Sequence, residues 1–142
     1  MYKRQEPAGE IKKLHKGALI QCVGQGNTTA YSLKKIADKG VLFVGPNEPV
    51  YEGMVIGEHV LPADMEMNAV KAKATTNIRV TGAVGVVEKL GMHKTMCLEE
   101  AIAYIRDDEL VEVTPKHIRM RKRTLSQSQR ETMRRRNNSS KR

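Results

Sequence analysis

Apolar residues occur along the first half of the chain in short runs separated by turn-forming residues. Residues 18–23 form one such run, followed by a Gly-Gln-Gly-Asn segment, and residues 41–44 and 50–57 form two more beside glycine, proline or asparagine. Short, β-branched runs bounded in this way are typical of strands. We therefore expect strands in these three regions, a further strand at residues 28–33, and one or two helical turns at residues 34–39.

The clearest helical pattern lies later in the chain. Leu98, Ala101, Ile102 and Ile105 are spaced i, i+3, i+4 and i+7, which aligns four apolar side chains along one face of a helix. This pattern predicts a helix at about residues 97–106, with Ile102 in the core.

Two strands are predicted after this helix. Residues 110–114 form an apolar, β-branched run that ends at Pro115, which cannot donate a hydrogen bond within a sheet. Residues 118–123 alternate, so that Ile118 and Met120 fall on one face and arginines on the other. The arginines of this basic face are Arg119, Arg121 and Arg123. Several short strands around one well-defined helix predict an α+β domain with a mainly antiparallel β-sheet.

Residues 68–82 separate the two halves and show little periodicity and no acidic side chain. Exposed loops of this length in a compact domain are usually functional or disordered. The loop contains three cations, Lys71, Lys73 and Arg79. Taken alone, an ordinary basic surface explains them equally well.

The distribution of basic residues along the chain favours a functional interpretation of these cations. The chain has a net charge of +9, and residues 116–142 contain eleven Lys or Arg residues against one acidic residue. Beyond Thr124 there are almost no apolar residues, so we expect residues 124–142 to form a disordered basic tail. Basic segments without acidic neighbours are typical of nucleic-acid binding. The candidate contacts here are Lys116, Arg119, Arg121, Lys122, Arg123, Arg134, Arg135 and Arg136.

The aromatic content limits the mode of recognition. With no Trp, one Phe and four Tyr, a base-stacking platform of the RRM type is poorly supported, and recognition of backbone and shape fits better.

Other chemistry finds little support in the sequence. The Gly-Gln-Gly-Asn segment lacks the spacing and the lysine of a Walker phosphate loop, and the four histidines stand in no recognised nucleophile motif. Cys22 and Cys97 form no CxxC pair, and the acidic run at residues 107–109 is interpreted as a solvated turn. No apolar run is long enough to span a bilayer, and the N-terminus does not resemble a secretory signal. We expect no catalytic residue, cofactor, metal or membrane contact in this chain.

Four stretches resemble a known family. They are residues 39–44 (KGVLFV), residues 50–59 (VYEGMVIGEH), residues 76–79 (TNIR, leading to Gly82) and residues 98–125 (LEEAIAYIRDDELVEVTPKHIRMRKRTL). Through these motifs the chain from about residue 17 to residue 125 resembles the C-terminal domain of the TypA/BipA family of ribosome-associated translational GTPases.

The resemblance implies a ribosome-binding protein that acts in ribosome assembly and in adaptation to stress or low temperature. Its partners would be large-subunit rRNA and the acceptor end of the A-site tRNA, and it would be a cytoplasmic monomer, or one in an organellar stroma or matrix. GTP and Mg²⁺ would bind in an upstream domain outside this chain. Carried onto this sequence, the family's loop contacts fall on Asn68, Lys73, Thr76, Asn77, Arg79 and Gly82.

The sequence departs from the family pattern inside this loop. Ala74 and Thr75 stand where the family usually has Lys-Leu, Val84 and Gly85 replace an acidic pair, and Met92–His93 replace Pro-Pro. These changes remove one cation and one apolar contact from the loop. Of the properties that the resemblance implies, tRNA binding by the loop is the one that these substitutions affect most.

The resemblance also divides the chain. We interpret residues 1–5 (MYKRQ) as an adapter-derived scar, residues 6–16 as a linker remnant, residues 17–123 as the C-terminal domain and residues 124–142 as the tail. The first interpretation of function is an RNA-binding module of a larger GTPase. The alternatives are an autonomous basic accessory protein of the ribosome, which upstream genomic sequence would distinguish, and a small enzyme, which would need turnover by the isolated chain.

Overall fold

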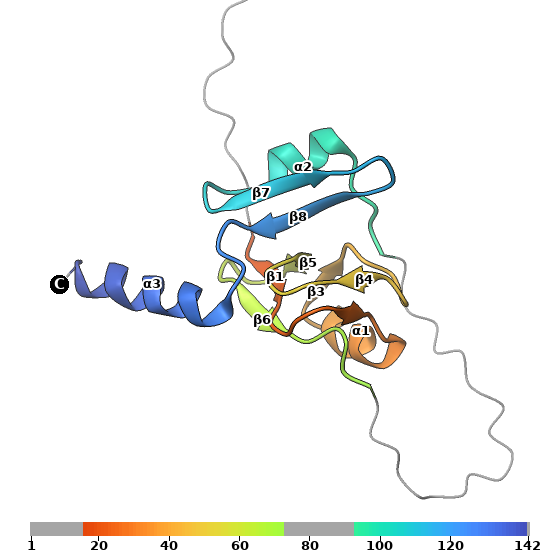
Figure 1. The fold of residues 1–142 in the computed structure, drawn as a ribbon, viewed down its shortest axis with the longest axis horizontal. Helices are drawn as coiled ribbons and strands as arrows, with labels where there is room; N and C mark the ends of the chain where they lie inside the picture. The colour runs from red at the N-terminus through yellow and green to blue at the C-terminus, as the bar shows by residue number, and fades with distance from the viewer. Residues whose placement is uncertain (1–15, 73–92, 142) are drawn as a thin grey trace, which may run out of the picture.

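A four-stranded sheet forms the centre of the computed structural model, which describes residues 16–72 and 93–141 (Figure 1). The strand order is β3-β5-β1-β6, in which β5 is antiparallel to β1 and β3, and β6 is parallel to β1. The strands are β1 (Ala18–Gln21), β3 (Gly40–Leu42), β5 (Val55–His59) and β6 (Met65–Met67). Two short strands, β2 (Gly26–Asn27) and β4 (Pro49–Val50), form a separate antiparallel pair. The predicted α+β class with mainly antiparallel pairing is confirmed.

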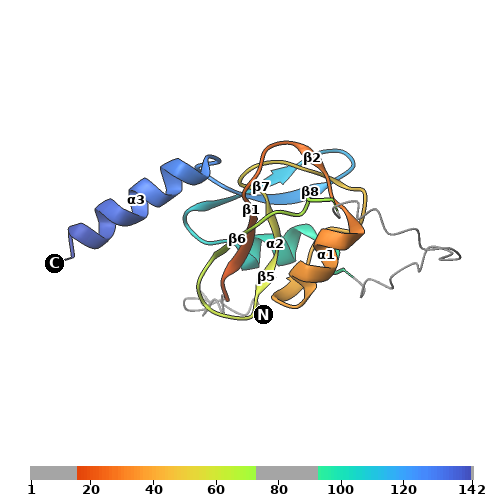
Figure 2. The ribbon, with the colours of Figure 1, turned by 90° about the horizontal axis from the view of Figure 1, so that it is seen from below.

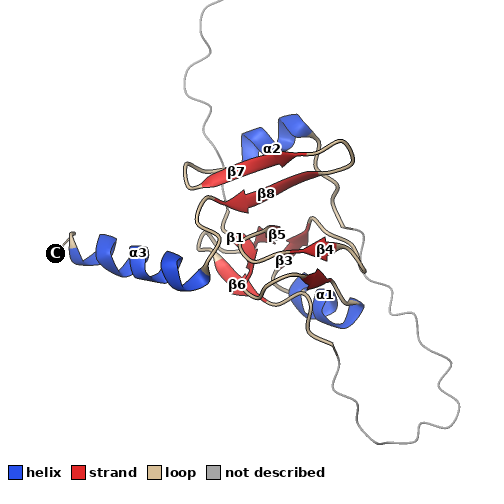
Figure 3. Cartoon of the chain, in the orientation of Figure 1, coloured by secondary structure: helices blue, strands red, loops and turns tan. Residues whose placement is uncertain are grey.

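The central strand β1 is buried on both faces, and each face has its own core. Leu19 packs in a cluster with Leu33 and Ile36 from the first helix, whereas Ile20 packs in a cluster with Ala101 and Met120. Because successive side chains of a strand point to opposite faces, one strand contributes to both clusters. The sheet therefore lies between α1 on one side and α2 with the C-terminal hairpin on the other, as Figure 3 shows.

The first helix, α1 (Ala30–Ala37), occupies part of the segment predicted as a strand. The Thr29 side chain accepts a hydrogen bond from the backbone N–H of Ser32 at 3.3 Å, which is the role of an N-cap residue. Leu33 and Ile36 then fall on the buried face. The strand prediction at residues 28–33 was wrong because the capping threonine was not recognised.

The second helix, α2 (Leu98–Tyr104), confirms the predicted element but not its predicted face. Ala101 is fully buried, whereas Ile102 is 54% exposed. The helix ends at Tyr104, and the extended backbone of Ile105 carries the chain away before the apolar stripe is complete. The buried side therefore follows Ala101, Tyr104 and Ile105, and the placement of Ile102 in the core was wrong.

The last two strands, β7 (Glu109–Val113) and β8 (Ile118–Lys122), form an antiparallel hairpin, as predicted. The hairpin is joined to the body of the domain where the N–H of Lys122 donates to the carbonyl of Gly53 at 2.8 Å. Gly53 has a φ of +87°, and a Cβ there would lie 2.8 Å from the Cα of Leu125. Both the left-handed backbone and the close approach of the chain require glycine at this position.

Residues Gln127–Ser139 form a third helix, α3, where a disordered tail was expected. Figure 2 shows α3 extending away from the rest of the molecule, and none of its residues is buried. The shortage of apolar residues beyond Thr124 agrees with the lack of a buried face on α3. The sequence did not predict the contacts at the N-terminal end of the helix. There the backbone N–H of Gln127 donates to Glu52 at 2.8 Å, and Arg130 pairs with Glu66.

Candidate nucleic-acid interface

The arginines of β8 form the centre of the candidate interface. Met120 is 4% exposed and points inward, while Arg119 and Arg121 are half-buried on the opposite face and Arg123 is exposed. None of these three arginines forms an ion pair with another residue in the described part of the chain. The three arginines thus lie on the face opposite Met120, as the alternation predicted.

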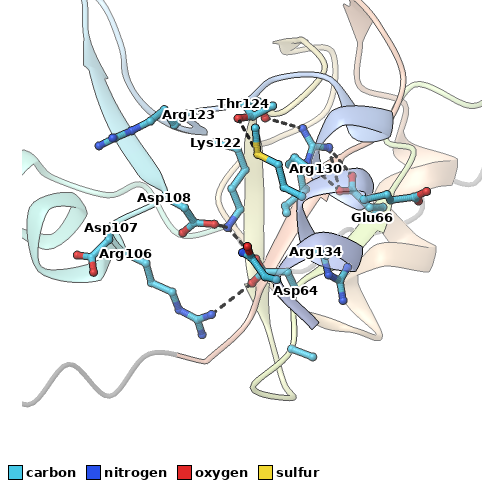
Figure 4. A pocket seen from close by; sticks show the side chains of 15 residues that line it. Asp64, Glu66, Arg106, Asp107, Asp108, Lys122, Arg123, Thr124, Arg130 and Arg134 are labelled. Atoms are coloured by element: carbon cyan, nitrogen blue, oxygen red, sulfur yellow. Dashed lines mark hydrogen bonds and ion pairs between the residues drawn. The ribbon is translucent and has the colours of Figure 1, made fainter. Parts of the chain in front are cut away.

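Lys122 was expected to contact RNA, and the structure corrects this. Its side chain is 2% exposed, and its Nζ lies 2.7 Å from Asp64 Oδ2, 2.8 Å from Glu109 Oε1 and 3.0 Å from Asp108 Oδ2. Figure 4 shows Asp64 and Asp108 beside this ammonium group. The strand alternation that puts Met120 inside also puts Lys122 inside, and three carboxylates neutralise it there. Lys122 therefore joins elements of the fold and is not part of the interface.

The acidic run before β7 also differs from its interpretation. Asp107 is exposed, as in a solvated turn, but Asp108 bonds Lys122 and Glu109 is almost fully buried. A buried carboxylate is stable when it is paired and hydrogen-bonded, and Lys122 supplies that pairing. The predicted solvated turn is thus correct for Asp107 and for Asp108, whose side chain is 65% exposed, and wrong for Glu109.

The ionisation of this cluster follows from its contacts. Burial alone would lower the pKa of Lys122, but hydrogen bonds to Asp64 and Glu109 raise it above the ordinary range. Burial alone would raise the pKa of Asp64, but the backbone N–H of Ala18 and the Lys122 ammonium hold it below the ordinary range. Both groups are therefore charged at neutral pH, and the cluster is an ion-pair network.

A second anchor holds the start of α3. The guanidinium of Arg130 contacts both carboxylate oxygens of Glu66, with Nη2 at 2.8 Å and 2.9 Å, and also donates to the carbonyl oxygens of Thr124 and Leu125. Sequence inspection did not single out Arg130, because its partner Glu66 is distant along the chain. The charge run alone does not distinguish a structural arginine from a free one.

The remaining arginines of α3 differ from Arg130. Arg134, Arg135 and Arg136 are exposed and form no ion pair within the described residues. Arg134 lines a cavity of about 670 Å³ between α3 and the Lys122 cluster, which also contains Asp107 and Asp108 (Figure 4). Beyond its anchored first turn, the helix thus presents three exposed cations that pair with no residue in the described part of the chain.

The turn between β7 and β8 is held by short-range hydrogen bonds. The Thr114 hydroxyl donates to the carbonyl of His117 at 3.1 Å and accepts from its N–H at 3.0 Å. Lys116 stands exposed in this turn and forms no ion pair within the described residues. A turn closed by two hydrogen bonds, with a cation that pairs with none of the described residues, suits contact with an anion.

Only the start of the long loop lies within the described residues. The Oδ1 of Asn68 accepts from the N–H of Val70 at 3.0 Å, and the carbonyl of Lys71 accepts from the hydroxyls of Thr29 and Ser32. Asn68 is half-buried, while Lys71 is exposed. The other loop residues singled out from the sequence lie outside the described residues: Lys73, Ala74, Thr75, Thr76, Asn77, Arg79, Gly82, Val84, Gly85 and Met92.

The comparisons with known proteins identify the family. The family model for the TypA/BipA C-terminal domain matches residues 16–127, which include all of the folded body described above. The chain belongs to the TypA/BipA family.

Similar TypA/BipA proteins are found in several bacteria. The large ribosomal subunit assembly factor BipA of Bacillus subtilis (strain 168) is 38% identical over 124 residues, covering 87% of this chain and 20% of that protein. The protein of the same name from Escherichia coli (strain K12) is 42% identical over 125 residues, covering 86% and 20%. That from Synechocystis is 41% identical over 115 residues, covering 81% and 19%. The chain spans about one fifth of the length of these relatives.

The family match also separates the two parts of the candidate interface. It ends at residue 127, the first residue of α3, so the β8 arginines lie within the TypA/BipA domain and those of α3 lie beyond the match. Among the residues that the structure describes, no helix combines the length and apolar character needed to cross a membrane.

Proposed function

We propose that the chain is the RNA-binding C-terminal module of a TypA/BipA-like translational GTPase that docks on the ribosome. Family membership and the name of its relatives, which are large ribosomal subunit assembly factors, support this proposal. In this view the parent protein acts in the cytoplasm, and GTP and Mg²⁺ bind outside this chain. The chain contributes recognition and no catalysis.

One observation carries the proposal: the outward face of β8 is basic, and its arginines form no ion pair with any residue that the structure describes. Arg119, Arg121 and Arg123 lack ion-pair partners in the described part of the chain, although acidic side chains are present nearby. Two acids of this region, Asp64 and Glu109, are bound to the inward-facing Lys122, and Glu112, opposite Arg119 on β7, accepts a hydrogen bond from the Tyr51 hydroxyl at 2.6 Å. The outer face of β8 therefore keeps an excess of positive charge, which is the arrangement needed to contact phosphates.

The finer part of the proposal concerns the A site. Asn77 and Arg79 combine an amide that donates and accepts with a planar guanidinium, which suits them to one particular site on rRNA or on the tRNA acceptor end. The free cations of β8 and α3 supply affinity for any RNA backbone. Specificity and general affinity are therefore assigned to different segments.

Two variants separate these contributions. Truncation after Leu125 removes α3 while leaving β8 and Lys122 in the fold, and so deletes six basic residues and one acidic residue. The second variant, Asn77→Ala with Arg79→Ala, removes a single charge, and Lys39→Ala in the exposed turn after α1 is its charge-matched control. Affinity for large ribosomal subunits and for a random RNA duplex is measured across a salt series.

The expected results differ in kind. Truncation lowers affinity for both RNAs and flattens the salt dependence, by about 0.9 in the log–log slope for each duplex phosphate that the shortened chain no longer neutralises. The double variant lowers the ratio of ribosome affinity to duplex affinity, whereas Lys39→Ala leaves that ratio unchanged. An unchanged ratio in the double variant would place specificity outside the loop, and an absence of ribosome binding by the intact chain would overturn the proposed function.

A further inference from the structure

A groove of about 420 Å³ lies between the tip of the β7–β8 hairpin and the segment that carries Phe43 and Val44. Its floor consists of buried or half-buried apolar side chains, among them Phe43, Met96 and Met120. Lys116, His117 and Arg119 line the hairpin side. A volume in this range is typical of a ligand site, and polar side chains here share the lining with the apolar ones.

We infer that this groove binds one unstacked nucleotide of an RNA strand, with the base against the apolar floor and a phosphate on Lys116 and Arg119. The inference rests on the proposed function, because it specifies which form of RNA, an unstacked nucleotide, binds to this part of the interface. It also gives the half-buried Arg119 a ligand.

The charge of the groove supports an anionic ligand. Lys116 and Arg119 have no ion-pair partner among the described residues. The acidic residue that lines the groove, Glu48, lies on the opposite side, 3.9 Å from Nε2 of His93, and its side chain is 46% exposed. Two cations therefore line the groove on the hairpin side, and the carboxylate that also lines it lies beside an imidazole.

The rigidity of the cationic wall supports a defined site. Lys116 sits in the turn that the Thr114 hydroxyl closes by two hydrogen bonds to the backbone of His117. Arg119 is held in register with Glu112 across the hairpin. A wall that is already ordered loses little conformational entropy when a ligand binds.

The apolar floor argues for a base. A phosphate alone would need no apolar surface, and a base in a duplex is stacked between its neighbours and cannot enter a groove of this kind. Sequence-selective proteins that bind single-stranded RNA place unstacked bases against aromatic and imidazole rings, and Phe43, His93 and His117 supply such rings here. One groove of this kind needs fewer aromatic residues than the RRM-type platform that the composition argues against.

The probe is a single-stranded RNA hexamer with a central 2-aminopurine, compared with the same hexamer in a duplex. Binding is measured by anisotropy and base insertion by 2-aminopurine fluorescence. Lys116→Ala with Arg119→Ala tests the cationic wall, and Arg135→Ala with Arg136→Ala on α3 removes the same charge from outside the groove. His117→Ala tests the wall next to the base, since the hydrogen bonds of the turn use the backbone of His117.

We expect the wild-type chain to prefer the single strand and to change the 2-aminopurine signal on binding. The groove double variant should lose that preference, about tenfold in affinity for the hexamer, while the α3 variant weakens both RNAs alike. His117→Ala should reduce the fluorescence change and leave duplex affinity unaltered.

Three outcomes would overturn the inference. They are equal loss of hexamer binding in the groove and α3 variants, equal affinity of the wild-type chain for the two RNAs, and equally strong competition from a Glu-rich peptide. In each case the chain still binds RNA and the proposed function survives. Absence of binding to the hexamer, the duplex and the ribosome would instead contradict the proposed function itself.

Discussion

The ammonium of Lys122 lies 2.8 Å from the carboxylate of Glu109, and both side chains are buried. The two residues face each other across the β7–β8 hairpin, and Asp64, in the segment before β6, completes the contact from the central sheet. A charge pair in this position joins the hairpin to the body of the domain. It also explains why a residue within a basic run takes no part in the basic surface.

Replacement of Lys122 by methionine should strongly destabilise the domain, because it removes the ammonium that the carboxylates of Asp64, Asp108 and Glu109 contact. Removal of one partner from a buried ion pair costs about 3–5 kcal/mol. Arg123→Met, at the exposed neighbouring position, is the matched control and should change stability by less than about 0.5 kcal/mol. Urea denaturation followed by circular dichroism measures both, and similar midpoints for the two variants would contradict the structural role of Lys122.

The lowered pKa of Asp64 gives the stability a dependence on pH. At pH values between the lowered pKa of Asp64 and the ordinary pKa of an aspartate, the folded protein binds fewer protons at Asp64 than the unfolded chain does. Its contribution is therefore complete above the ordinary pKa and is lost as pH falls through the lowered pKa. Asp64→Asn should reduce stability at neutral pH and make the decline between about pH 5 and pH 2 shallower.

Asp107→Asn is the control for this experiment, because Asp107 is an exposed carboxylate on the same cavity. Glu66 has a pKa raised by burial and contributes with the opposite sign, so the slope of the wild type alone does not isolate Asp64. Unfolding free energies are compared at each pH. Parallel curves for wild type and Asp64→Asn would show that Asp64 is not the group responsible.

The sequence was sufficient to predict the elements whose pattern is local. The β7–β8 hairpin follows from the alternation around Met120 and the proline after β7, and the outward position of Arg119 and Arg121 follows from the same alternation. These features depend on the period of two in a strand. They need no knowledge of which other segments lie nearby.

The features that the sequence did not predict depend on distant partners. Lys122 pairs with Asp64, 58 positions away, and Arg130 pairs with Glu66, 64 positions away. The alternation that places Met120 inward also places Lys122 inward, but the sequence does not show which carboxylates neutralise it, and nothing near Arg130 in the chain marks it as an anchor. The disorder predicted beyond Thr124 was wrong for the same reason, since α3 begins at contacts with Glu52 and Glu66.

Two substitutions in α2 test directly which face of this helix packs against the core. Ala101→Asp should destabilise the domain by several kcal/mol, because the carboxylate would be buried without a partner. Ile102→Asp, one position along the same helix, should cost less than about 1 kcal/mol because Ile102 is largely exposed. Thermal melting of the two variants decides between the two phases, and a larger loss for Ile102→Asp would restore the phase predicted from the sequence.

The order of α3 should depend on Arg130. Isolated helices of this length are marginal in water, and α3 buries no side chain that could stabilise it. Its first turn is held where Arg130 contacts Glu66 and the carbonyl oxygens of Thr124 and Leu125. Arg130→Met should therefore increase hydrogen exchange across residues 131–139 while leaving the melting temperature of the domain nearly unchanged. Arg135→Met removes the same charge from an exposed position and should leave exchange unaltered. If Arg130→Met leaves the protection of residues 131–139 at its wild-type level, the helix is ordered by its own sequence and not by this anchor.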